Sequence, residues 1–200
     1  MIKNIETIHF QTKFGQFLNT VYEINSIDEP YTQFGFAIYT KATLKQESPL
    51  VRIHSSCIFS EVFSSLVCDC SSQLSKTLKM FNKKGGIFLY LDQEGRSHGL
   101  FNKVKELKLQ EQGLDTIEAS LALHLEVDSR IYNSAALILK DLGITSLRLV
   151  TNNPKKVSSI EELGLKVIDR VPMEIKGNEF NYNYLKTKKD KMGHLLKLHN

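Results

Sequence analysis

The sequence has little of what would mark a secreted or membrane-bound protein. No apolar run approaches the length of a membrane span, and the first residues, MIKNIETIHFQTKFG, lack the apolar core of a signal peptide. The 200 residues include only three cysteines, and an odd number excludes a complete disulfide framework. We therefore expect a protein of a reducing compartment, the cytoplasm, with no membrane partner.

The chain also lacks a large excess of charge of either sign. Its formal net charge is +4, and the Lys and Arg residues are spread out except for a denser run at residues 186–191. A nucleic-acid partner is not required by this charge, and we expect none. The same modest positive charge would suffice for a basic pocket that binds a phosphorylated small molecule.

The remaining composition, 42% hydrophobic and 24% charged, is ordinary for a globular protein. Apolar and alternating runs predict strands at residues 33–40, 50–54, 87–91, 146–150 and 166–171, after short strands in the first 45 residues. Helical spacing and Gly or Pro boundaries predict helices from Ser71 or Ser72 to Gly85, at 100–112 and 133–142, from Pro154, and at 187–198. We expect an α/β (α+β) fold, a single domain over residues 1–200, with a mixed sheet flanked by helices.

The three cysteines are the most informative feature. Cys57, Cys68 and Cys70 lie within fourteen residues of one another. Clustered thiolates are typical ligands of a soft or borderline metal, most plausibly Zn²⁺, and three protein ligands leave a tetrahedral ion one open position for catalysis. The alternative is three buried or surface thiols that bind no metal.

Three polar segments directly follow predicted strands, at residues 52–57, 92–96 and 151–156. Strand ends are where α/β folds place their ligands. Together the segments offer carboxylate, guanidinium, hydroxyl and ammonium groups, which suit a phosphate-bearing substrate such as a nucleotide.

Each of these side chains also has an ordinary structural interpretation. Arg96 could form a surface ion pair, and Asp128 could cap the following helix as readily as take part in catalysis. The lysines at residues 155–156 are unfavourable for a helix dipole, which hints at a ligand, but they could be simply solvated. His54 and His98 could be metal ligands or proton carriers, or ordinary loop residues.

The ordered motifs resemble those of GTP cyclohydrolase II, the enzyme that opens riboflavin biosynthesis. They are RIHSSC, CDCSSQL, QEGRSHGLFNK, LQEQGLDTIEA, DSRIY, LRLVTNNPKK and RVP. The resemblance runs from about Lys13 to Leu196, nearly the whole chain. It implies a GTP cyclohydrolase II-like domain that converts GTP to formate, pyrophosphate and 2,5-diamino-6-ribosylamino-4(3H)-pyrimidinone 5′-phosphate.

The resemblance also implies the roles of individual residues. One Zn²⁺ per subunit, held by the three cysteines, would activate water for hydrolysis at C8 of the purine. Arg130 matches the proposed nucleophile at the α-phosphate, Asp128 matches the proton acceptor beside it, and Glu94 would read the guanine edge. The substrate-binding residues implied are Arg52, Ile53, His54, Ser55, Ser56, Gln73, Glu94, Gly95, Arg96, Thr116, Thr151 and Lys156. Mg²⁺ would accompany the triphosphate, and the family is typically a homodimer.

The chain departs from the family pattern near this chemistry. The family usually has S-E-C where Ser56 precedes the first cysteine, and Arg and Gly around C-D-C where Val67 and Ser71 stand. Asp92 replaces a basic residue, and Leu107 replaces a tyrosine thought to assist hydrolysis at C8. A leucine cannot donate a hydrogen bond or relay a proton.

These departures leave three hypotheses open. The first is the complete GTP reaction. The second is a diverged paralogue that stops at the formamidopyrimidine nucleotide or acts on another nucleotide or pyrimidine. The third is a catalytically inactive GTP-binding subunit.

Overall fold

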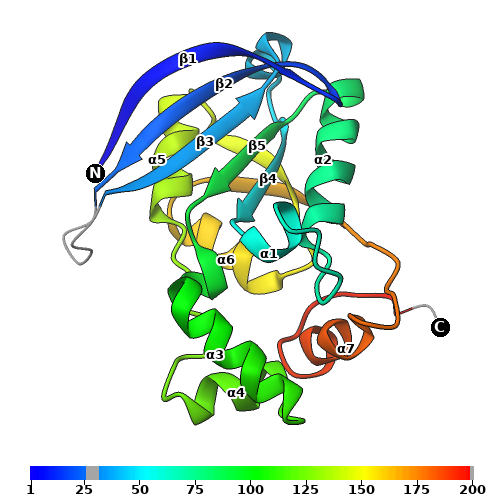
Figure 1. Ribbon diagram of the computed structural model, residues 1–200. Helices are drawn as coiled ribbons and strands as arrows, with labels where there is room; N and C mark the ends of the chain where they lie inside the picture. Colours follow the sequence, from blue (N-terminus) through cyan, green and yellow to red (C-terminus); the bar gives the residue numbers. More distant parts are fainter. Residues whose placement is uncertain (26–31, 199–200) are drawn as a thin grey trace. The chain divides into compact units, whose positions relative to one another are not determined.

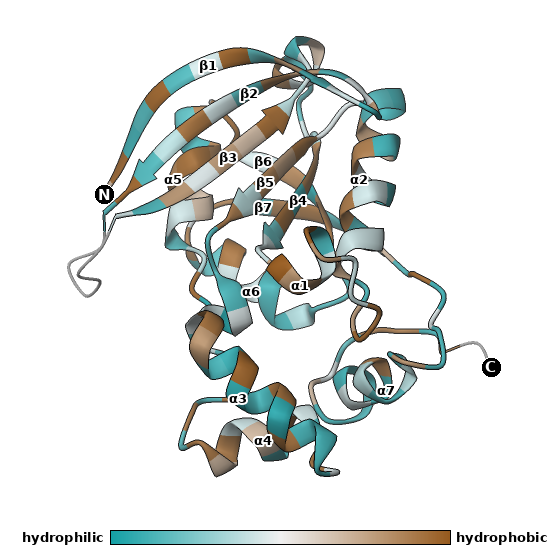
Figure 2. Cartoon of the chain, viewed as in Figure 1, coloured by the Kyte–Doolittle hydropathy of each residue, from teal (hydrophilic) through white to brown (hydrophobic). Residues whose placement is uncertain are grey.

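The protein is described by a computed structural model that covers residues 1–25 and 32–198. Seven strands form one sheet in the order β1-β2-β3-β5-β4-β6-β7. Figure 1 labels β1 to β5, and Figure 2 also labels β6 and β7. The strands are β1 (Ile2–Thr12), β2 (Gly15–Ile24), β3 (Gln33–Tyr39), β4 (Leu50–Ser55), β5 (Ile87–Leu91), β6 (Ser146–Val150) and β7 (Lys166–Val171).

The sheet is mixed. Strands β1, β2, β3 and β5 are antiparallel to their neighbours in that series, whereas β4 pairs with β6 and β6 with β7 in parallel. Parallel neighbours need a crossover connection, and α6 supplies one between β6 and β7. The mixed α/β class expected from the sequence is therefore confirmed.

Seven α-helices and two short 3₁₀ helices are present in the described ranges. They are η1 (Lys41–Lys45), α1 (Ile58–Glu61), α2 (Cys70–Lys84), η2 (Glu94–Ser97), α3 (Gly99–Glu111), α4 (Thr116–Ala122), α5 (Asn133–Asp141), α6 (Pro154–Glu162) and α7 (Tyr182–Asp190). Figure 2 contrasts the largely hydrophobic strand β5 with the mainly hydrophilic helix α7. None of the described helices is long and apolar enough to cross a bilayer.

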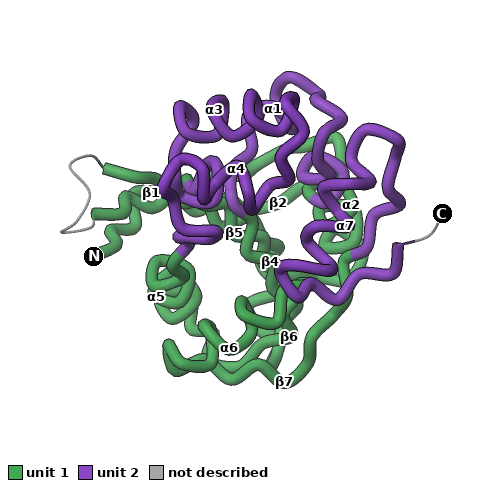
Figure 3. Tube along the Cα trace, turned by 90° about the horizontal axis from the view of Figure 1, so that it is seen from below, with its two compact units in different colours: residues 1–54, 74–92, 131–173 green, residues 55–73, 93–130, 174–200 purple. Residues whose placement is uncertain are grey.

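The chain divides into two compact units (Figure 3). Unit 1 comprises residues 1–54, 74–92 and 131–173 and contains the sheet up to His54 of β4. Unit 2 comprises residues 55–73, 93–130 and 174–200, of which the last two lie outside the described ranges. The boundary between His54 and Ser55 falls inside residues 52–57, one of the polar segments that the sequence predicts at a ligand site.

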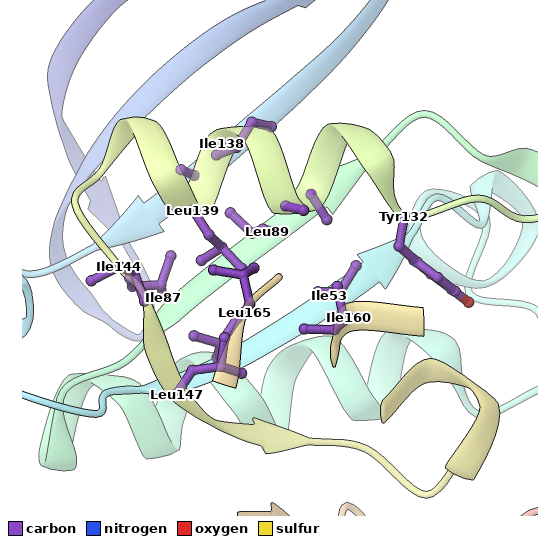
Figure 4. Packing of buried hydrophobic residues seen from close by; sticks show 14 of the residues in the cluster. Ile53, Ile87, Leu89, Tyr132, Ile138, Leu139, Ile144, Leu147, Ile160 and Leu165 are labelled. Atoms are coloured by element: carbon purple, nitrogen blue, oxygen red, sulfur yellow. The ribbon is translucent and has the colours of Figure 1, made fainter. Parts of the chain in front are cut away.

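Unit 1 is organised around a hydrophobic core (Figure 4). Ile138 and Leu139 of α5, Leu89 of β5 and Leu147 of β6 have no solvent exposure, and each buried side chain of this size contributes roughly 1.5–3 kcal/mol. Strand β5 is buried at four of its five positions because it lies inside the sheet, between β3 and β4. This explains its continuous apolar sequence.

Most predicted elements of unit 1 are confirmed. Strands β5, β6 and β7 have the predicted bounds, and Pro154 opens α6 with the Asn153 side chain accepting a hydrogen bond from the Lys155 amide at 3.0 Å. The first two strands are long rather than short, since β1 and β2 form an antiparallel ladder along their whole length, with one register shift between Asn4 and Glu6.

Two predicted helix boundaries were wrong. Helix α2 already begins at Cys70, so Ser71 and Ser72 lie inside its first turn and neither caps it. The C-terminal helix runs over Tyr182–Asp190 instead of 187–198. Helix α4 was not predicted, although Asp115 and Glu118 form a capping box at its start, a signal that the sequence carries.

Candidate active site and metal centre

The three cysteines of unit 2 converge. Their sulfur atoms all lie within 4.8 Å of one another, and the Cys57 and Cys68 sulfurs are 3.6 Å apart. Two thiolates bound to one tetrahedral zinc at about 2.3 Å each are separated by about 3.8 Å, so this spacing fits the ion. Within the described residues this is the one cluster with metal-ligating geometry, and it includes neither His54 nor His98.

Local structure brings these thiols together. Cys57 directly precedes α1, and Cys70 is the first residue of α2. The Ser71 amide donates a hydrogen bond to the buried Ser60 hydroxyl at 3.0 Å, which ties the start of α2 to α1. The loop that carries Cys68 is thereby closed back on Cys57.

The thiols share their protons unequally. Hydrogen bonds from Cys57 and then Cys70 lower the pKa of Cys68 to about 2. Hydrogen bonds with Cys57 and Cys68 raise the pKa of Cys70, and burial raises it further. Closely spaced thiols of which one ionises at the expense of another favour the binding of a divalent cation.

A lysine and a glutamate surround Cys57. The Lys103 ammonium donates to the Cys57 sulfur at 3.2 Å and forms an ion pair with Glu94, which also accepts the Ile58 amide at 2.7 Å. Burial would lower the pKa of Lys103, but the Glu94 hydrogen bond and the Cys57 charge outweigh it and raise the pKa. Sequence reasoning gave Lys103 no role, because no local spacing connects positions 57, 94 and 103.

The two serines before Cys57 are tied to Gln93. The Ser55 hydroxyl donates to the Gln93 side-chain oxygen at 2.9 Å, and the Gln93 amide donates to the Ser56 hydroxyl at 3.1 Å. The predicted substrate residues Ser55 and Ser56 thus fix the start of the loop that carries Glu94.

The next residues of that loop adopt the left-handed backbone region, with φ of 59° at Gly95, 58° at Arg96 and 70° at Ser97. This conformation costs a residue with a side chain about 1–2 kcal/mol. The Arg96 guanidinium offsets it with hydrogen bonds to the Val127 carbonyl at 2.8 Å, Glu106 at 2.8 Å and Ser120 at 2.9 Å. Arg96 is therefore part of an internal polar network, and the surface ion pair considered from sequence was wrong.

The same network involves His98 and Thr116. The His98 side chain is 5% exposed, with its Nε2 atom 2.9 Å from the Ser129 hydroxyl and its Nδ1 atom 3.7 Å from Glu106. Thr116 is buried at the start of α4, and its carbonyl accepts the Ser120 hydroxyl at 3.0 Å. The side chain of His98 is thus buried rather than that of an exposed loop histidine.

Asp128 and Arg130 form a two-pronged ion pair. The Arg130 Nε and Nη2 atoms lie 2.7 and 2.5 Å from the two Asp128 carboxylate oxygens. Asp128 does not cap α5, whose N-cap is Tyr132. The pair is partly buried, so one carboxylate fixes the plane of the guanidinium.

Five predicted substrate residues lie in unit 1. The Lys156 ammonium is buried, donates to the Ile53 carbonyl at 3.0 Å and lies 5.1 Å from the centre of the Tyr132 ring. Arg52 donates to the Val150 carbonyl at 3.0 Å. Thr151 accepts the Asn153 amide at 3.1 Å. The interpretation of Lys156 as a solvated lysine was therefore wrong, whereas Lys155 is exposed.

His54 is the fifth of these residues. Its side chain is buried in unit 1, where its ring centre lies 5.2 Å from that of Phe88 and 5.8 Å from that of Tyr90. Its ring therefore packs against two aromatic side chains of β5.

Comparison with known proteins gives this arrangement a family. A model of the family described as GTP cyclohydrolase II matches residues 3–172, which is most of the chain. The chain belongs to the GTP cyclohydrolase II family. It is thus a member of a family of hydrolases, and the resemblance seen in the motifs is confirmed.

Individual relatives are similar over different shares of their length. "GTP cyclohydrolase-2" of Acinetobacter baylyi is 42% identical over 195 residues, which cover 97% of this chain and 96% of the relative. "Riboflavin biosynthesis protein RibBA" of Cytophaga hutchinsonii is 49% identical over 158 residues, 78% of this chain and 39% of that protein. The RibBA protein of Chlorobium phaeovibrioides is 44% identical, over 92% of this chain and 44% of its own. The chain spans less than half the length of these RibBA relatives.

Among the solved structures that align with the chain is one described as RibBX, a two domain 3,4-dihydroxy-2-butanone 4-phosphate synthase from A. baumannii. It covers 87% of this chain and 40% of its own, with 15% identity and a TM-score of 0.46.

Helix α3 carries Glu106 and Leu107 side by side. The Glu106 side chain is buried and accepts hydrogen bonds from Arg96 and from the Ser120 hydroxyl at 2.6 Å. Glu106 therefore forms a buried ion pair with Arg96, while the half-buried Leu107 offers no polar group.

Proposed function

We propose that the protein is a zinc-dependent hydrolase that opens the imidazole ring of GTP and releases formate and pyrophosphate. The product would be 2,5-diamino-6-ribosylamino-4(3H)-pyrimidinone 5′-phosphate, the first intermediate of riboflavin biosynthesis. The convergence of three thiols in a chain of the GTP cyclohydrolase II family carries this proposal.

Cys57, Cys68 and Cys70 would hold the zinc. When bound, zinc supplies a Lewis acid that lowers the pKa of a water molecule and so makes hydroxide available near neutral pH. Lys103 places a positive charge beside the Cys57 sulfur, which offsets part of the negative charge of a three-thiolate site. Glu94 holds both that lysine and the Ile58 amide next to Cys57.

Asp128 and Arg130 would act at the triphosphate. The carboxylate fixes the guanidinium through two atoms, which suits both binding of the α-phosphate and nucleophilic attack on it. In that step the Arg130 nitrogen would bond to the α-phosphorus and lose a proton to Asp128, and pyrophosphate would leave with the electrons of the broken P–O bond. Water would then cleave the P–N bond, which frees the 5′-phosphate and restores Arg130.

The remaining assignments also stay proposals. Glu94 would read the guanine edge, and the other substrate-binding residues named from the sequence would bind the rest of GTP. Mg²⁺ would accompany the triphosphate, since its charge needs a counter-cation. A homodimer and a cytoplasmic location complete the hypothesis.

Leu107 favours a second candidate, an enzyme that stops at the formamidopyrimidine nucleotide. The half-buried leucine cannot relay a proton in the second hydrolysis at C8. Pyrophosphate would then form without formate.

The test is incubation of the purified, zinc-loaded protein with GTP and Mg²⁺, with GTP, formate, pyrophosphate and nucleotide products measured by mass spectrometry and coupled assays. We expect formate and pyrophosphate to appear in step with GTP loss, and a chelator or Cys70→Ser to abolish both. GTP binding in calorimetry without any product would instead identify an inactive GTP-binding subunit.

Leu107→Tyr separates the first two candidates. If the protein already completes both hydrolyses, this variant changes formate yield little. If it stops at the formamide, Leu107→Tyr should raise formate towards the amount of GTP lost. Phe101→Tyr is the matched control, because it adds a phenol at an exposed position of the same helix.

A further inference from the structure

Helix α7 places a lysine against the cysteine loop. The Lys188 ammonium lies 3.5 Å from a carboxylate oxygen of Asp69, the residue between Cys68 and Cys70. Both side chains are secluded, with 2% of Asp69 and 16% of Lys188 exposed. Lys188 and Asp69 are 119 residues apart in sequence. Lys188 thus contacts the loop at the residue between two candidate metal ligands.

Other contacts hold the two partners. The Gln73 side-chain amide donates to the second Asp69 oxygen at 2.5 Å, and the Asp69 carbonyl accepts the Gln73 amide at 2.9 Å. The Lys188 ammonium also lies 4.2 Å from the centre of the Tyr184 ring. Burial would lower the pKa of Lys188, but its interactions with Tyr184 and with the Asp69 carboxylate raise it, so the lysine stays cationic at neutral pH.

We infer that Lys188 is a positioning residue of the metal site, and that α7 clamps the Cys68–Cys70 loop through the Lys188–Asp69 ion pair. This rests on the proposed binding of zinc by the three cysteines. Helix α7 lies beyond residues 3–172 of the family match, so that match assigns it no role.

The physical reason is the charge of Asp69. A carboxylate that is almost fully removed from water is tolerated only when it is paired and hydrogen-bonded. Without the Lys188 cation, the loop would have to shift to hydrate Asp69. Because Cys68 and Cys70 are its chain neighbours, that shift would move two of the three thiols out of ligating geometry. Partners of this kind typically change metal affinity 10–100-fold.

The experiment measures zinc release to a chromogenic chelator from the zinc-loaded, full-length protein, without GTP. Lys188→Met keeps the length of the side chain and removes its charge, and we expect release to accelerate about tenfold or more. The double variant Lys188→Met/Asp69→Asn removes both charges and should return release to within about threefold of wild type, because the buried negative charge is removed together with the cation beside it. Lys188→Arg should retain zinc.

Lys186→Met is the matched control, because Lys186 is an exposed lysine of the same helix that pairs with Asp190. It should release zinc at the wild-type rate. Circular dichroism of every zinc-loaded variant checks folding, and if Lys188→Met fails to fold, the Lys188→Arg and double-variant rates decide.

Equal zinc release from wild type and Lys188→Met would overturn the inference and leave the proposed function intact. A double variant that releases zinc as fast as Lys188→Met would also overturn the inference. If Lys188→Met does not fold, a double variant that releases zinc about tenfold faster than wild type would overturn it. A wild-type protein that retains zinc but yields no product from GTP would overturn the proposed function alone. A wild-type protein that takes up no zinc would overturn both the inference about Lys188 and the zinc dependence of the proposed function.

Discussion

The two compact units bury apolar side chains to different extents. Every member of the main hydrophobic cluster lies in unit 1, from Tyr22 of β2 to Leu165 before β7. In the described part of unit 2, the buried residues classed as hydrophobic are Cys57, Ala119 and Leu185. Its other buried residues are polar or charged, among them Asp69 and Glu106.

This difference separates the main hydrophobic core from the candidate metal centre, while predicted substrate residues lie in both units. Unit 1 is stabilised by apolar burial, which is large and needs no particular partner geometry. Unit 2 depends on paired polar groups, each of which contributes a net of only about 1 kcal/mol but is costly to leave unpaired. We therefore expect the metal to matter more for the stability of unit 2 than for that of unit 1.

The largest expected effect is that of metal removal. Chelation of the zinc-loaded protein, or Cys70→Ser, should speed amide hydrogen exchange in residues 57–73 by about 100-fold or more. Exchange in β5 and β6 should change less than about threefold. Hydrogen-exchange mass spectrometry measures both regions at once, and an equal loss of protection in the two would contradict the distinction between the units.

The second prediction concerns the hydrophobic core of unit 1, whose stability should depend on apolar packing. Leu139→Ala on α5 should lower the free energy of unfolding by about 2–5 kcal/mol, because it opens a cavity at a fully buried position. Leu137→Ala, at a 42% exposed position of the same helix, should cost less than about 1 kcal/mol. Urea denaturation measures both, and similar losses would mean that α5 is not packed as described.

The polar network of unit 2 should be sensitive at Glu106. Glu106→Ala leaves Arg96 without its buried carboxylate partner and should cost about 3 kcal/mol, the lower end for a broken buried ion pair. The control is Glu111→Ala on the same helix, which breaks an exposed pair with Lys108 and should cost less than about 1 kcal/mol. Denaturant unfolding measures the free energy of unfolding of both variants. Equal losses in Glu106→Ala and Glu111→Ala would show that the α3 network adds no stability.

The smallest expected effect concerns the start of α4. Asp115 accepts hydrogen bonds from the Ile117 and Glu118 amides, and replacing this cap by alanine should cost about 1 kcal/mol. Burial would raise the pKa of Asp115, but hydrogen bonds from Lys191 and these amides lower it. The stabilisation by the charged carboxylate is therefore present above about pH 4, the unfolded value, and is lost as pH falls through the lower folded pKa.

Asp115→Asn tests this pH dependence, because asparagine also caps helices but does not titrate. The difference in unfolding free energy between wild type and Asp115→Asn should shrink between pH 5 and pH 3. A constant difference over that range would show that Asp115 does not titrate with folding.

Local sequence determined much of unit 1. The apolar run of β5 and the Asn153–Pro154 helix start are readable because strand burial and helix initiation depend on adjacent residues. The capping box at Asp115 and Glu118 was equally local and could have predicted α4. The spacing of Cys57, Cys68 and Cys70 likewise indicated a metal site before any fold was known.

Tertiary structure alone decided what surrounds those cysteines. Lys103 meets Cys57 across 46 residues and Lys188 meets Asp69 across 119, and no periodicity or spacing encodes such contacts. The burial of Arg96 and Lys156 was equally invisible, because a charged side chain reads as exposed until its partners are known. The sequence thus specified three thiols and a scaffold. Chain folding determined which buried charges hold the thiols in place, since ion pairs of this kind exist only once distant segments have packed.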